Sequence, residues 1–379
     1  MKIWMKHAKI MVGDMMLKNK KTPMFIKIIT IIFFITIVLI GLTIILKPNI
    51  LKDYLGLGNQ AIKNPKPPTP KKLTIIDEDS NSRPIAVMID NNVGNNSHYG
   101  LQQAYLTYEI IVEGGLTRLM ALFKDKNVSQ IGPVRSSRHY FLDYALESDA
   151  IYAHFGWSPY AQNDIKKLAV NNINGMYDSA PFWRVTWLYA PHNVLTSTEK
   201  LYDYAKTKNY PLESDSWQLL NYSTDEINLE KLNKANRKKE SSDDNILNPT
   251  VANNIQIIYS YSQNRSYIYD NNQKVYLRYM NNNPHVDAES KENLAYKNII
   301  IEIVNNKTID SDGRQELYTV GSGTGYYITN GYSLPIIWEK QERKAKTTYK
   351  YENNDIIKIN DGNTIIEVIS SQDNIDIQE

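Results

Sequence analysis

The chain has 379 residues, and its apolar and charged fractions of 42% and 22% are those of a globular protein long enough for two hydrophobic cores. It contains no cysteine, which excludes disulfides, thiolate metal sites, a cysteine nucleophile and a lipidated N-terminal cysteine. The net charge of +2 is unevenly distributed: lysines concentrate before residue 73, so residues 73–379 are acidic, which argues against nucleic-acid binding.

An apolar segment dominates the N-terminal part. Residues 28–46 carry no charge and are long enough to cross a bilayer core as a helix. The lysines of residues 1–27 precede it, so the positive-inside rule places this basic tail in the cytoplasm. A cleaved signal peptide is the alternative, but no small-residue cleavage site follows. We expect a single-pass cell-membrane anchor, a Pro- and Lys-rich linker over 47–72, and extracytoplasmic domains beyond it.

The first folded elements are strands. Residues 83–90 predict a buried strand that ends on a carboxylate, Asp90. Residues 106–112 and 116–123 predict two strands of a hairpin, because the adjacent glycines between them suit a tight turn. Three carboxylates therefore lie on or beside these strands.

Those carboxylates are candidate catalytic groups. Glu113 would serve as a general acid, with Asp90 or Glu109 as its partner. Glu109 and Glu113 share one face of their strand by the period of two. The alternative is that both acids form salt bridges with Arg118 or another arginine.

Three arginines near the hairpin predict an anion site. Arg118 follows the Gly-Gly turn, while Arg135 and Arg138 bracket the start of a helix predicted over 138–147, for which Ser136 is the N-cap candidate. Each guanidinium offers a rigid fork of donors that suits carboxylate or phosphate. If the hairpin and the helix start meet, the three arginines surround one ligand.

Further candidates follow the helix. His154 ends a predicted strand and is either an acid–base group or a hydrogen-bonded histidine of the core. Trp157 opens a stretch rich in aromatic residues, which would stack on sugar rings or fill the core. His192 and Asn193 precede a helix start in a loop, where functional groups are often found.

No metal or cofactor site is predicted. The six histidines show neither H-x-x-x-H nor H-E-x-x-H spacing. The glycine-rich residues 321–325 lie between two predicted strands with no helix after them, which indicates a hairpin turn and not a phosphate-binding loop.

The fold class that these patterns predict is α+β. A mixed sheet-and-helix domain is expected over 73–220, followed by a polar linker or insert over 221–254. Residues 255–379 contain short alternating runs broken by Asn and Gly, which predict a mostly antiparallel β domain.

Several long motifs resemble the YerB-like family of bacterial extracytoplasmic proteins, which contain a domain of unknown function. The matching stretches include RPIAVMIDN, YEIIVEGGLTRLMALF, IGPVRSSRHYFLDYALESDAIYAHFGWSP and APHNVLTS, at residues 83–91, 108–123, 131–159 and 190–197. The resemblance implies an α+β first domain, a β-rich second domain and the outer face of a Gram-positive-type membrane. Many members are lipoproteins held by an N-terminal cysteine, which this chain lacks.

The resemblance brings no settled activity, so two functions remain open. The first is binding or remodelling of cell-wall glycan, or of an anionic wall precursor, with the carboxylates as catalysts and the arginines as anion ligands. The second is a non-catalytic scaffold for membrane-bound wall-synthesis proteins. Whether the protein is an enzyme stays open.

Overall fold

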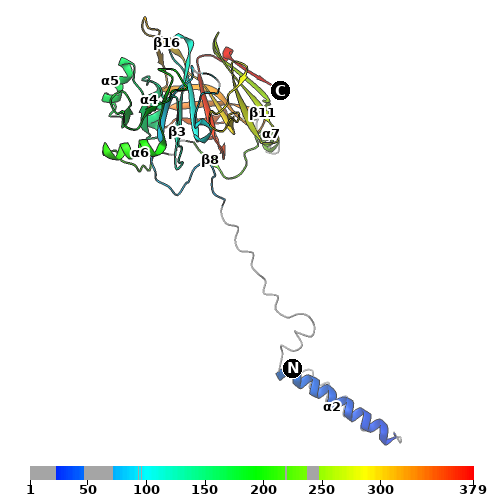
Figure 1. Cartoon of the computed structure of the whole chain (residues 1–379). Coiled ribbons are helices and arrows are strands. Elements are labelled where there is room, and N and C mark those ends of the chain that lie inside the picture. The colour runs from blue at the N-terminus through cyan, green and yellow to red at the C-terminus, as the bar shows by residue number, and fades with distance from the viewer. Residues whose placement is uncertain (1–22, 47–70, 93, 95, 218–219, 237–246) are drawn as a thin grey trace. The chain divides into compact units, whose positions relative to one another are not determined.

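The computed structural model describes residues 23–46, 71–92, 94, 96–217, 220–236 and 247–379. The chain divides into two units, Met1–Pro70 and Lys71–Glu379, of which the second contains all the strands described (Figure 1). The expected cytoplasmic tail before residue 23 and most of the expected linker, residues 47–70, lie outside the described residues.

The first unit contains helix α2 (Met24–Leu46). The prediction of a single-pass anchor over 28–46 is wrong, because no helix in the described parts of the chain combines the length and apolar character needed to cross a membrane. The prediction that a single N-terminal helix attaches the protein to a membrane is wrong for the same reason.

An 11-stranded mixed sheet forms the centre of the second unit. Its order is β20-β19-β18-β15-β22-β2-β3-β1-β4-β5, and β9 pairs with β19. The strands are β1 (Ile85–Asp90), β2 (Leu106–Ile111), β3 (Thr117–Phe123), β4 (Ile151–His154), β5 (Asn172–Asn174), β9 (Thr250–Val251), β15 (Asn298–Ile303), β18 (Gly321–Thr329), β19 (Tyr332–Lys340), β20 (Thr348–Tyr351) and β22 (Thr364–Ile369). The central strand β22 is parallel to both its neighbours, β2 and β15. The strands of the second predicted domain, β20 to β22 in the sheet order, therefore continue directly into those of the first, β2 to β5.

A second, antiparallel sheet packs against the first. It contains β10 (Asn254–Ser260), β11 (Gln263–Asp270), β12 (Val275–Met280), β13 (Asn283–Pro284), β14 (Ala295–Tyr296) and β23 (Ile375–Gln378). Every second residue of β10 is buried, as expected of a sheet with one face on the core. Figure 1 shows β11 and the helices α4, α5 and α6 at opposite sides of the main sheet.

Short elements complete the second unit. The helices are α4 (Phe141–Glu147), α5 (Pro159–Lys167), α6 (Thr198–Thr207) and α7 (Leu229–Asn236), with 3₁₀ turns η1 (Leu101–Gln103), η2 (Glu113–Gly115) and η4 (Gln372–Asn374). Three two-stranded pairs are β6 (Trp183–Arg184) with β7 (Val194–Leu195), β8 (Tyr222–Ser223) with β21 (Ile359–Asn360), and β16 (Asn306–Thr308) with β17 (Gln315–Leu317).

This architecture confirms the α+β class. The predicted hairpin is present as β2 and β3, and both glycines of its turn have positive φ, 67° at Gly114 and 69° at Gly115. The expected N-cap is wrong: α4 begins after Tyr140, and the Ser136 hydroxyl instead donates to the Phe155 carbonyl. The division into domains at 73–220, 221–254 and 255–379 stays a prediction.

A buried ion triad joins the two sheets. The Glu109 carboxylate on β2 accepts hydrogen bonds from Nε of Arg265 on β11, at 2.6 Å, and from Nη2 of Arg278 on β12. All three side chains are fully buried. Burial alone would raise the pKa of Glu109, but the two guanidiniums outweigh it and hold that pKa below its usual value. The alternative that Glu109 is a salt-bridge partner is thus the one the structure shows.

We expect Glu109→Gln to lower the free energy of unfolding by about 3–5 kcal/mol, because it leaves two buried cations without a carboxylate. Glu339→Gln is the control, since Glu339 pairs with Lys350 at a partly exposed position and should cost at most about 1 kcal/mol. Urea unfolding of both variants measures the difference, and equal losses would contradict the role of the triad.

The buried Glu302 gives a pH-dependent prediction. Burial, together with the nearby Glu147 carboxylate, raises the pKa of Glu302 to about 7, despite hydrogen bonds from Tyr349 and Tyr144. The unfolded chain loses this proton near its ordinary pKa, so the folded state loses relative stability as pH rises through 7. Between pH 5 and 8, Glu302→Gln should therefore lose about 2 kcal/mol less stability than the wild type. Urea unfolding at several pH values measures this difference. If the free energy of unfolding changed equally with pH in the wild type and in Glu302→Gln, the prediction would be refuted.

Candidate functional site

Asp90, the last residue of β1, is the centre of the site. Its side chain is 3% exposed, and Oδ2 faces two cationic or polar partners: Nδ1 of His192 at 2.6 Å and Nε of Arg135 at 3.1 Å. Its Oδ1 accepts from the backbone N–H of Asn92 at 2.9 Å. The carboxylate is therefore held in one orientation from both oxygens.

Two buried histidines hold the backbone of Asp90. Arg278 donates to Nδ1 of His285, Nε2 of His285 is 2.8 Å from Nδ1 of His98, and Nε2 of His98 is 2.6 Å from the Asp90 carbonyl oxygen. Because Arg278 is always a donor, each histidine must donate from Nε2 and accept at Nδ1. Burial lowers the pKa of His98 to about 4 and that of His285 as well, so both rings are neutral. A hydrogen-bonded chain thus runs from the ion triad to Asp90.

Next to Asp90, two arginines and a carboxylate form a group. Arg138 makes a bidentate ion pair with Glu113, with Nη2 2.7 Å from Oε2. Burial would raise the pKa of Glu113, but the hydrogen bond and charge of Arg138 keep it below its usual value. A general acid needs a raised pKa, so this environment does not favour the predicted acid role.

Arg118 differs from its neighbours because it makes no ion pair among the described residues. It lies opposite Asp90 in the β1–β3 register, is 8% exposed, and donates from Nη1 to the Ser136 carbonyl at 2.5 Å. Burial, and the positive charges of Arg138 and Arg135, lower its pKa to about 10. The three arginines therefore lie near one another, and the charge of Glu113 only partly offsets the effect of burial on Arg118, which has no ion pair among the described residues.

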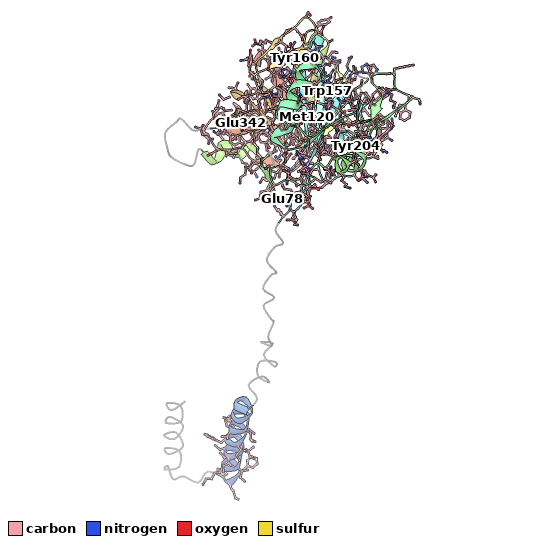
Figure 2. All side chains as sticks on the ribbon, turned by 90° about the vertical axis from the view of Figure 1, so that its left-hand side faces the viewer. Glu78, Met120, Trp157, Tyr160, Tyr204 and Glu342 are labelled. Atoms are coloured by element: carbon pink, nitrogen blue, oxygen red, sulfur yellow. The ribbon has the colours of Figure 1, made fainter. Side chains whose placement is uncertain are left out.

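A cavity of about 440 Å³ opens beside Arg135. It is lined by Val134, Arg135, Ser136, Phe155, Gly156, Trp157, Asn174, Met176, Tyr177, Arg184 and Pro191. Trp157, labelled in Figure 2, and Tyr177 have ring centroids 5.6 Å apart. We call this the arginine cavity; its volume lies in the ~300–1,000 Å³ range of small-molecule sites.

Other predicted site residues have supporting positions. Asn193 accepts a hydrogen bond from Nη1 of Arg184 at 2.6 Å and so orients that arginine of the cavity. His154 is fully buried, with Nδ1 2.7 Å from the Gly156 carbonyl, and burial lowers its pKa to about 4. This is the hydrogen-bonded core histidine of the two readings. No group of three metal-ligating side chains occurs in the described part of the chain.

The structure therefore brings together Asp90, Arg135 and His192 beside the cavity that Trp157 lines. It places Glu113, Arg118 and Arg138 in the adjoining group, and His154 in the core. Sequence reasoning missed Arg184, although an arginine directly after Trp183 in an aromatic stretch was a usable signal. It also missed the pair His98 and His285, which only tertiary structure brings into contact.

Replacement of Arg118 and of Arg138 by Met should affect the stability of the protein differently. We expect Arg118→Met to unfold at no lower urea concentration than wild type, because it removes a desolvated cation at the cost of one hydrogen bond. Arg138→Met should lose about 2 kcal/mol, because Glu113 loses its charged partner. A larger loss for Arg118→Met than for Arg138→Met would show that Arg118 is an ordinary stabilising residue.

Comparisons with known proteins agree with this fold. Residues 73–211 match the N-terminal domain, and residues 255–366 the C-terminal domain, of "Protein of unknown function (DUF3048)". The chain is 29% identical over 259 residues to "Putative lipoprotein YerB" of Bacillus subtilis (strain 168), covering 68% of this chain and 73% of that protein. It matches the crystal structure of that YerB protein with a TM-score of 0.67 and 26% identity, over 79% of this chain and 94% of the other.

The relative also bears on localisation. It is described as a putative lipoprotein, not as a protein held by a single N-terminal helix, so the predicted single-pass localisation with a cytoplasmic N-terminus is corrected. The two matched domains and the shared structure decide the classification. The chain belongs to the YerB-like family, whose domains have no known function.

Proposed function

We propose that this protein binds an anionic glycan of the cell envelope in the arginine cavity. The observation that carries the proposal is the presence of two arginines beside two aromatic faces in one cavity, Arg135 and Arg184 with Trp157 and Tyr177. The relative's description as a putative lipoprotein supports an envelope ligand.

The arginines have donors left for a ligand. Arg135 uses Nε toward Asp90, and Arg184 uses Nη1 toward Asn193. The remaining guanidinium nitrogens of both residues have no hydrogen-bond partner among the described residues. Because guanidinium donors lie in one plane, they suit the paired oxygens of carboxylate or phosphate.

The aromatic residues supply the sugar-binding part. Tyr177 is 71% exposed and stacks obliquely on Trp157, so an apolar face reaches solvent at the mouth of the cavity. Such faces pack against the C–H faces of sugar rings, as the core of a binding site that polar groups then orient. The net charge of the second unit is negative, so the two arginines form a local positive site within it, and an anion would bind there in preference to the rest of its surface.

Binding to purified, solubilised wall fragments tests the proposal. Arg135→Gln and Arg184→Gln should each weaken binding at least tenfold, about 1.4 kcal/mol, and the affinity of the wild type should fall with added salt. Arg314→Gln is the control, since Arg314 pairs with Asp310 and Asp312 outside the cavity. Wild-type affinity in both cavity variants, measured by titration calorimetry, would refute the proposed site.

A further inference from the structure

The Asp90–His192 pair has the geometry of a general base. The carboxylate is 3% exposed while the imidazole is 31% exposed, so a buried acid orients a ring that reaches solvent. Asp90 can only accept, so Nδ1 of His192 carries the proton that bridges the 2.6 Å contact. The lone pair then lies on Nε2, the nitrogen on the side of the ring away from Asp90.

The pair also lies at the margin of the arginine cavity. Arg135, which shares Oδ2 of Asp90 with His192, lines the cavity, as does Pro191, the residue before His192. The support behind the pair is rigid: the Asp90 carbonyl accepts from His98, and Oδ1 accepts from Asn92. An orienting carboxylate that is fixed on all sides is what a preorganised base requires.

Resting on the proposed glycan binding, we propose that His192, oriented by Asp90, activates water to hydrolyse a carboxylic ester carried by the bound anionic glycan. His192 is the catalytic residue and Asp90 the positioning residue. The free donors of Arg135 and Arg184 stabilise the oxyanion that forms.

The step balances with water as the only co-reactant. Nε2 of His192 takes one proton from water as the water oxygen attacks the ester carbonyl carbon, which gives a tetrahedral oxyanion. The bond from that carbon to the glycan oxygen then breaks. The imidazolium returns its proton to the departing alkoxide, so a glycan hydroxyl and a carboxylic acid are released and His192 is neutral again.

An ester suits these groups better than an amide. An alkoxide is a much weaker base than the anion of an amine, so it leaves the tetrahedral intermediate with less help from the protonated imidazole. The positively charged guanidiniums stabilise the negative charge that forms on the oxyanion. The orienting group also has a defined electrostatic role: Asp90→Asn removes the negative charge that faces Nδ1–H of His192 and that stabilises the imidazolium, so it weakens the base.

The test measures acetate release by the full chain from chemically O-acetylated peptidoglycan, together with binding of the same material. We expect release by the wild type, and rates at least about 100-fold lower for His192→Gln, at an unchanged dissociation constant, and for Asp90→Asn. His139→Gln is the matched control, because His139 also contacts a carboxylate, Glu316 at 3.2 Å, but lies outside the arginine cavity. It should release acetate at the wild-type rate.

The outcomes separate this proposal from glycan binding. Binding without acetate release by the wild type, or wild-type release by His192→Gln, overturns the hydrolysis and leaves the binding function intact. Loss of binding in Arg135→Gln with slow residual release supports both. Should the folding of Asp90→Asn be impaired, His192→Gln decides alone, since its side chain is partly exposed.

Discussion

The Glu109 carboxylate lies between two fully buried guanidiniums, Arg265 and Arg278, each from a different strand of the second sheet. Three fully buried charges are tolerated only when their geometry is complementary. This contact therefore restricts how the second sheet can pack against the first. The same Arg278 begins the chain of neutral histidines that ends at the Asp90 carbonyl. Sheet packing and site geometry are thus consequences of one electrostatic arrangement.

The site itself contains a local imbalance of charge that the rest of the fold sustains. Arg138 and Arg135 have carboxylate partners, whereas Arg118 is buried beside both of them with a carbonyl as its hydrogen-bond acceptor. Burial of a charge without an ion pair costs stability, and such costs are common at functional sites.

The sequence predicted local features well and distant contacts poorly. The run before Asp90 and the Gly-Gly hairpin carry local signals of period and turn chemistry, and both elements are present as predicted. The helix predicted over 138–147 begins only at Phe141, so Arg135 and Arg138 do not bracket its start. Arg265 and Arg278 could not be identified as partners of Glu109, because alternation along a strand does not say which face is buried. Nor does any local signal specify that β22 lies between β2 and β15, since parallel pairing joins segments far apart in the chain.

The central position of β22 has a consequence for biosynthesis. Its residues, Thr364–Ile369, follow all the other strands of the main sheet along the chain, yet they pair with β2 on one side and with β15 on the other. While the polypeptide is being synthesised, β2 and β15 therefore each keep an open edge until residues 364–369 have appeared. The nascent protein therefore needs protection from edge-to-edge association, and a premature stop before residue 364 would leave it without a closed sheet.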